Sequence, residues 1–359
     1  MSFNQVNIER IFMKWRGVSY DVGRVMGMNW RPIFEAVVIQ RELEIIKNDL
    51  HCNAIRICGF DIRRLSIASE MALKLELEVL FCPEIWHKSQ EKTLNYILKA
   101  ADAAEILNAK YPGRLIFGIG SEFTLFTQGI LPGKSLMKRV RHPMFWDNIK
   151  AGKHNEPLNF FLAKITNAVK KVFHGKLTYA SLIWEKVDWN IFDIVCVDHY
   201  REERINDQYI DMLKPLFDFG KPIINSEFGC RTYKGAENSG AMGFGIINFP
   251  TLGLHQIPLI GRFIKPRIKG VHVRDENLQA NAITTTLELL KNAGVDGVFV
   301  ITFVTPIFPY NDNPKYDLDM SSFSLVKSYT KGNKGLIYPD MPWDPKKSFY
   351  AVANFYSGL

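Results

Sequence analysis

Two glutamates occupy positions that suit chemistry better than stability. Glu122 directly follows the apolar run Leu115-Ile-Phe-Gly-Ile-Gly-Ser121, and Glu227 lies in Lys221-Pro-Ile-Ile-Asn-Ser-Glu-Phe-Gly229. Both runs have the composition of buried strands, and a charge at the end of such a strand is costly to the fold. Because the arrangement occurs twice, each time after a serine, we interpret the two carboxyl groups as one shared reactive centre.

The spacing of the pair indicates which elements carry it. Glu227 follows Glu122 by 105 residues, which is about three βα units at roughly 30 to 35 residues each. In a (β/α)8 barrel, this spacing puts the two residues at the fourth and seventh strands. Carboxyl groups facing each other across a barrel mouth can reach the ~5–5.5 Å separation that a double displacement at a sugar carbon requires.

Strand and helix patterns alternate along the chain in the way that a barrel requires. Eight strand patterns occur at 15–20, 53–58, 77–83, 115–121, 177–183, 192–198, 221–229 and 297–303. Helix patterns occur at 34–50, 64–74, 91–110, 158–173, 207–219, 276–293 and 345–356. We expect one α/β domain over 1–359, a TIM barrel with its core at about 15–305 and a C-terminal extension at 306–359.

A doubly wound open sheet shows the same alternation. Its dinucleotide-binding form has a glycine-rich turn after the first strand, but residues 20–27 lack the G-x-G-x-x-G pattern. The sequence also has no phosphate-binding loop of the GxxxxGK[ST] form. The barrel is therefore the favoured topology.

Two segments are too long for ordinary connections in a barrel, namely 123–155 after the fourth strand and 232–274 after the seventh. The second contains an uncharged run, 241–261, that is long enough to span a bilayer at ~20 residues. Two prolines and four glycines interrupt this run, so we expect no transmembrane span. The interpretations left open are a loop over the barrel mouth and a contact with a partner or a membrane surface.

The composition is that of an ordinary soluble protein, with 47% hydrophobic and 23% charged residues. We interpret the net charge of +8 as a solvated basic surface, without a specific nucleic-acid site, because Lys and Arg are spread over the helical segments. The five cysteines form no CxxC motif, and the N-terminal residues lack the pattern of an export signal. A cytoplasmic location is therefore expected.

Polar and aromatic residues gather at the expected C-terminal strand ends, the face that carries the active site in barrel enzymes. The candidates for substrate contact are Tyr20, Asp21, Arg56, Trp86, Ser121, Trp184, His199 and Tyr200. Aromatic rings can stack on sugar faces, and charged groups can bind hydroxyls. Arg56, Trp86, Trp184 and His199 also have purely structural interpretations. We interpret Glu84, His87 and Glu185 as solvated loop residues, and the histidine spacing predicts no metal site.

This pattern resembles that of the clan A glycoside hydrolases, retaining (β/α)8 barrels with an acid/base glutamate after strand 4 and a nucleophile glutamate at strand 7. The resemblance implies that Glu122 is the acid/base and Glu227 the nucleophile. It also implies that Arg56 holds the nucleophile, that Tyr200 hydrogen-bonds it and that His199 lines the site.

A narrower resemblance involves Arg16-Gly-Val-Ser-Tyr-Asp-Val-Gly23 and Ser226-Glu-Phe-Gly-Cys-Arg-Thr-Tyr-Lys-Gly-Ala236. Both segments are similar to a group of prokaryotic barrel proteins that are often labelled abortive infection proteins, which implies phage defence. The chain departs from the clan A pattern at Ser121, where the family usually has asparagine, and at 302–306, where many members have tryptophan.

Two functional hypotheses follow. The first is a retaining β-glycosidase or transglycosidase that acts on a glycan or glycoside without a cofactor or metal. The second is a weak or inactive barrel that binds carbohydrate or acts in phage defence, with 241–261 as a partner surface. An open cleft lined by Trp86, Trp184 and Tyr200 would favour the first, and a mouth blocked by the two insertions would favour the second.

Overall fold

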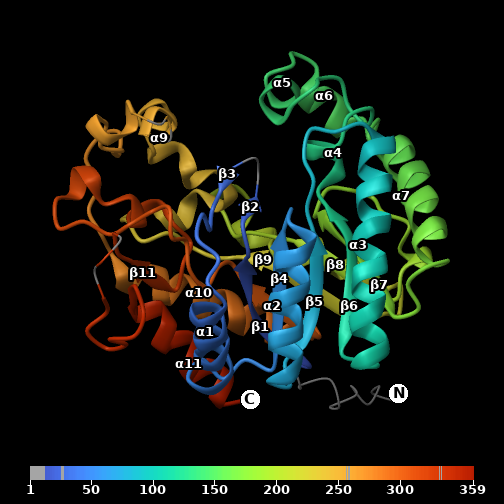
Figure 1. Ribbon diagram of the computed structural model, residues 1–359. Coiled ribbons are helices and arrows are strands. Elements are labelled where there is room, and N and C mark those ends of the chain that lie inside the picture. The colour runs from blue at the N-terminus through green and yellow to red at the C-terminus, as the bar shows by residue number, and fades with distance from the viewer. Residues whose placement is uncertain (1–12, 26–27, 256, 258, 331, 333) are drawn as a thin grey trace, which may run out of the picture.

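A closed barrel of eight parallel strands forms the centre of the protein (Figure 1). The computed structural model describes residues 13–25, 28–255, 257, 259–330, 332 and 334–359. The barrel strands are β1 (Trp15–Asp21), β4 (Ala54–Gly59), β5 (Glu78–Pro83), β6 (Leu115–Ser121), β7 (Lys176–Leu182), β8 (Val195–Asp198), β9 (Ile223–Phe228) and β10 (Gly297–Val300). They follow one another in chain order, and β1 pairs with both β4 and β10, which closes the barrel. The predicted TIM barrel is confirmed.

Helices surround the barrel (Figure 1). The long ones are α1 (Ala36–Asn48), α2 (Ile62–Lys74), α3 (Gln90–Lys110), α7 (Asn155–Val169), α10 (Glu276–Asn292) and α11 (Lys347–Ser357). Side-chain caps start several of them. For example, Asp275 accepts a hydrogen bond from the backbone N–H of Leu278 at 2.9 Å at the start of α10.

The prediction of a helix at 207–219 is wrong. The segment 207–219 forms only the turns η3 (Glu203–Gln208) and η4 (Asp211–Leu213) and the four-residue helix α8 (Lys214–Phe217). Pro215 is the reason, because proline lacks a backbone N–H and its ring clashes with the carbonyl four residues earlier, so it is tolerated only in the first turn of a helix. The outer layer of helices is therefore thin beside β8.

Alternate residues of each barrel strand pack on opposite sides. One apolar cluster fills the barrel interior and includes Ala54, Cys58 and Cys196. A larger cluster lies between the barrel and the helices and includes Ile55 and Ile57. Because side chains alternate along a strand, Arg56 lies on the interior face between Ala54 and Cys58.

The two insertions carry short helices and rise from the same side of the barrel, the side of the C-terminal strand ends (Figure 1). The first insertion, 123–155, contains α4 (Phe123–Phe126), α5 (Leu136–Val140) and α6 (Phe145–Lys150). The second, 232–274, contains η5 (Ala236–Asn238), η6 (Gly240–Ile246), α9 (Phe249–His255) and η7 (Gly261–Phe263). Within the described parts of the chain, no helix has both the length and the apolar character needed to cross a bilayer.

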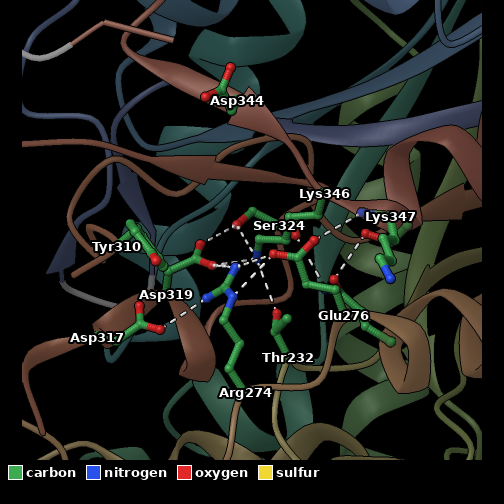
Figure 2. A network of polar contacts seen from close by, with 12 residues as sticks. Thr232, Arg274, Glu276, Tyr310, Asp317, Asp319, Ser324, Asp344, Lys346 and Lys347 are labelled. Carbon is green, nitrogen blue, oxygen red and sulfur yellow. Dashed lines mark hydrogen bonds and ion pairs between the residues drawn. The ribbon is translucent and has the colours of Figure 1, made fainter. Parts of the chain in front are cut away.

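The chain after β10 packs back onto the second insertion through buried charges (Figure 2). Asp319 Oδ2 lies 2.9 Å from Arg274 Nη2 and 2.8 Å from Lys346 Nζ, and the side chains of Asp319 and Lys346 are fully buried. Arg274 Nη1 also lies 3.0 Å from Asp317 Oδ2. The short elements outside the barrel are β2 (Arg24–Val25), β3 (Met28–Asn29), η2 (Trp189–Ile191), η8 (Pro314–Tyr316), η9 (Leu318–Ser321), β11 (Val326–Ser328) and β12 (Trp343–Pro345).

Candidate active site

A small pocket at the C-terminal ends of the strands encloses about 90 Å³. Both glutamates line it, Glu122 directly after β6 and Glu227 within β9. The other lining residues are Asp21, Trp30, Arg56, Glu84, Trp86, Ser121, Phe126, Tyr200, Ala241, Ile301 and Phe323. The structure therefore brings together every predicted site residue except Tyr20, Trp184 and His199.

Glu227 is held from both sides. Arg56 Nη1 forms an ion pair with its Oε1 at 2.8 Å, and the Tyr200 hydroxyl donates a hydrogen bond to its Oε2 at 2.9 Å. The register between β8 and β9 shifts just before Glu227, and such a bulge changes the direction of the side chain that follows it. Since Arg56 is buried and the Glu227 side chain is 17% exposed, the carboxylate remains open to the pocket.

Glu122 has an unusual backbone conformation. Its φ and ψ are both 47°, in the left-handed region, where residues other than glycine are uncommon. The Glu122 N–H donates to Ala180 O at 2.9 Å, and the next N–H, of Phe123, donates to the Tyr179 hydroxyl at 2.7 Å. Tyr179 in turn donates to Glu185 Oε2 at 3.0 Å. Backbone strain that the surroundings maintain in this way is typical of functional sites.

Glu185 is thus a buried residue that supports the turn after β6. The expectation that it is a solvated loop acid is wrong. It is 5% exposed. Burial raises its pKa to about 7, although hydrogen bonds from Thr124, Leu182 and Tyr179 act in the opposite direction.

A third carboxyl group, that of Asp198, lies next to Glu122. The hydroxyls of Ser121 and Ser226 donate to it at 3.1 and 2.6 Å. Burial, followed by the charge of Glu227, raises the pKa of Asp198 to about 8. Part of the Glu122 side chain reaches the pocket, but burial and the charges of Asp198 and Glu227 raise its pKa well above the usual value. Glu122 therefore favours the protonated form more strongly than an exposed glutamate does.

Two further acidic residues, Asp21 and Glu84, line the pocket. Burial raises the pKa of Asp21 to about 6, with Arg56 acting against that shift, and Thr302 Oγ1 donates to Asp21 at 3.2 Å. Glu84 is 5% exposed and lies 3.4 Å from Arg56, so the expected solvated loop position is wrong. Its backbone N–H donates to Gly59 O at 2.9 Å, which continues the strand pairing and holds Glu84 inside the barrel mouth.

Tyr20 lies outside the pocket because it points away from the barrel interior. It is fully buried among the residues that pack against the helices, its hydroxyl donates to Glu42 of α1, and Arg31 lies 4.6 Å from its ring. The alternation of side chains along β1 distinguishes Tyr20 from Asp21, and this signal was available in the sequence.

His199 and Trp184 also lie outside the pocket. The His199 ring stacks on Tyr209 at 4.1 Å, and its Nε2 lies 2.8 Å from Tyr209 O. Burial lowers the pKa of His199 to about 4, so it is a neutral, structural histidine. Trp184 packs edge-on against His154 at 5.0 Å.

The pocket walls that sequence reasoning missed come from distant segments. Phe126 belongs to the first insertion and Ala241 to the second, while Ile301 and Phe323 follow β10. The ring of Phe126 lies 5.4 Å from that of Trp86. The insertions thus narrow the mouth around the two glutamates, and no local pattern in the sequence indicates these contacts.

Two further cavities lie near the pocket. A groove of about 280 Å³ shares Glu84 and Trp86 with it and continues past Phe60, His87 and Lys88. A larger groove of about 610 Å³ lies between 201–206 and α10, but it contains neither Glu122 nor Glu227. The described residues include no group of three or more side chains arranged to hold a metal ion.

Solved structures of glycoside hydrolases share this fold. A GH113 β-1,4-mannanase has 13% identity and a TM-score of 0.59, with 97% of this chain and 100% of that chain covered. A family 5 glycoside hydrolase from Prevotella bryantii B14 has 12% identity and a TM-score of 0.54, with 99% and 100% covered. A β-glucuronidase from Ruminococcus gnavus has 10% identity and a TM-score of 0.55, with 96% and 50% covered.

No protein-family model and no curated protein matches the sequence. Identities this low show a common fold, and many activities occur on this fold. The comparisons give no support to the resemblance with abortive infection proteins.

Proposed function

We propose that the protein is a retaining β-glycoside hydrolase or transglycosidase. The supporting observation is the difference between its two pocket glutamates. Glu227 forms an ion pair with Arg56 at 2.8 Å, whereas Glu122 lies among other carboxyl groups and has a raised pKa. One carboxylate that can attack and one carboxylic acid that can donate a proton are the two groups that this mechanism needs.

In the first step, the Glu122 carboxyl group donates its proton to the glycosidic oxygen while Glu227 Oε attacks the anomeric carbon. The bond to the leaving oxygen breaks, the alcohol departs, and a covalent glycosyl ester forms on Glu227. In the second step, the Glu122 carboxylate takes a proton from water, and that water attacks the anomeric carbon and releases Glu227. A sugar hydroxyl in place of water gives transglycosylation.

The neighbouring side chains have supporting roles in this proposal. Arg56 and Tyr200 orient Glu227 and stabilise its charge when the ester breaks. Ser121 donates its hydroxyl hydrogen to Asp198, which leaves its lone pairs free to accept a hydrogen bond from a sugar hydroxyl. Trp86 is the aromatic surface between the pocket and the 280 Å³ groove, so we expect the substrate to extend in that direction.

The test is turnover of a panel of β-linked aryl glycosides by the wild-type protein and by glutamate variants. We expect Glu227→Gln to lose at least ~10³-fold in kcat, because no ester can form. Glu122→Gln should retain the first step with a good leaving group, and added azide, which needs no general base, should restore turnover. Glu91→Gln, an exposed change on α3, is the control.

Full activity in Glu227→Gln would exclude the proposed nucleophile.

The narrow pocket mouth favours a second candidate function, a barrel that binds a sugar without hydrolysing it. That candidate predicts saturable binding of an oligosaccharide with no turnover of any aryl glycoside.

A further inference from the structure

The positive charge of the chain is concentrated in the two insertions. Residues 123–155 contain six Lys or Arg and one acid, and residues 241–274 contain five Lys or Arg and no acid. Each segment therefore has a net charge of +5, while the whole chain has +8. The remainder of the chain is slightly acidic, so the net positive charge comes from the insertions, although most Lys and Arg residues lie elsewhere.

Large apolar side chains are exposed in the same two segments. The insertions make up roughly a fifth of the sequence, yet among the described residues they contribute eleven of the nineteen exposed large apolar side chains. Two of the eleven, Val271 and Val273, lie beside Arg274, where the second insertion ends. We call the other nine the apolar tips. They are Met137, Met144 and Trp146 in the first insertion and Phe249, Leu254, Ile257, Leu259, Ile260 and Phe263 in the second. Exposed apolar clusters of this kind mark interaction sites.

Exposed basic side chains lie close in sequence to the apolar tips. In the second insertion, Leu259 and Phe263 are 78% and 76% exposed, and Arg262, Lys265 and Arg267 close by are exposed as well. The first insertion has the same combination, with exposed Lys134, Lys138, Arg141, Lys150 and Lys153 in the same segment as its apolar tip. The combination of apolar and basic groups thus occurs twice, in segments that are far apart in the sequence.

Both combinations lie on the face that carries the pocket. Figure 1 shows α5 and α6 on one side of the barrel mouth and α9 on the other, all raised above the C-terminal strand ends. The bases of the two insertions contribute Phe126 and Ala241 to the pocket. A flat surface that contacted both tips would therefore cover the pocket mouth.

We propose that the two insertions form a docking surface for an anionic lipid bilayer. The apolar tips enter the headgroup region, and the exposed Lys and Arg side chains of the same segments bind the negatively charged headgroups. A nucleic acid would neutralise the same charges but would leave aliphatic side chains such as Leu259 and Ile260 in water, so the chemistry favours lipid. Docking turns the pocket toward glycans at the membrane surface, and it does not depend on the proposed glycosidase activity.

The electrostatic contribution to docking is tested by co-sedimentation of the full chain with phosphatidylcholine vesicles, with and without phosphatidylserine. We expect binding only to the anionic vesicles, and weaker binding as the salt concentration rises. Each lost basic residue should weaken partitioning about fivefold, from ~1 kcal/mol per residue. Arg262→Gln with Lys265→Gln should therefore lose about 25-fold, and Lys92→Gln with Lys99→Gln on α3 should lose nothing.

The apolar contribution to docking is tested with a triple variant that combines Leu259→Ser, Ile260→Ser and Phe263→Ser. These side chains are exposed, so the circular dichroism spectrum should stay that of the wild type while vesicle binding falls at least ~10-fold. The control combines Ile106→Ser and Phe160→Ser, which are exposed on α3 and α7.

Three results would overturn the proposal. The first is no binding to anionic vesicles. The second is unchanged vesicle binding in the triple serine variant together with tight binding of duplex DNA, which would identify a nucleic-acid surface. The third is self-association, measured by sedimentation velocity, that the triple variant abolishes when no vesicle binding occurs.

Discussion

At the scale of single residues, the protonation of Glu122 depends on its neighbours. Burial and the charge of Asp198 both raise the pKa of Glu122. Two serine hydroxyls hold Asp198 in place, so its distance from Glu122 does not rest on one contact. We therefore expect Asp198 to act as a positioning residue that raises the pKa of the proposed acid.

Replacing Asp198 should change the pH dependence of turnover. As the pH rises through about 8, Asp198 ionises beside Glu122. Asp198→Asn removes that charge, so the pKa of Glu122 falls and the proton needed for the first step is lost at lower pH. The alkaline limb of kcat/KM against pH should move to lower pH by about one unit. Asp102→Asn, an exposed change on α3, is the control, and an unmoved limb would show that Asp198 has no such role.

At the scale of elements, the buried charges in Figure 2 fasten the second insertion to the chain after β10. Lys346 precedes α11, Arg274 ends the second insertion, and Asp319 lies between them. Lys346 Nζ also donates to Thr232 Oγ1 at 3.1 Å, at the start of that insertion. Both ends of the second insertion are thus fixed to the same buried group.

Asp319→Asn should destabilise the fold strongly, because it leaves the Lys346 ammonium buried without its carboxylate. Breaking a buried pair from one side costs about 3–5 kcal/mol in the free energy of unfolding. Arg41→Gln, which breaks the exposed pair with Asp340, should cost under ~1 kcal/mol. Urea unfolding followed by circular dichroism measures both, and equal costs would show that the buried network adds nothing.

At the scale of the whole molecule, burial near the barrel mouth raises the pKa of several carboxyl groups. The pKa is about 8 for Asp198 and about 7 for Glu185. Both values lie above those of the unfolded chain, so these groups stabilise the fold at low pH, and this contribution is lost as the pH rises through the folded values. His199 acts in the opposite direction, but only between its folded pKa of about 4 and its usual 6.5.

The free energy of unfolding should therefore decrease between pH 6.5 and 8, by the order of 1–2 kcal/mol. Denaturant unfolding at several pH values in this window measures the slope, and Asp198→Asn should make it shallower. A stability that rises over this window would contradict the inferred protonation of the two groups.

Several features were predictable from the sequence because they are local or periodic. The strand and helix patterns gave the barrel, and the spacing of Glu122 and Glu227 gave their strands. The alternation of side chains along β4 explains why Arg56 points into the barrel. The same rule could have excluded Tyr20, and the position of Pro215 could have excluded the helix at 207–219.

Only the tertiary structure decided which side chains meet at the pocket. Glu84 and Glu185 look like loop acids in the sequence. Both are buried, because Glu84 pairs with Arg56 of β4 and Glu185 accepts hydrogen bonds from Thr124, Tyr179 and Leu182. Phe126, Ala241 and Phe323 form the walls, although they are separated by up to 197 residues. A sequence pattern reports the period of one element, but a pocket depends on contacts between elements, and closing the barrel is what brings those elements together.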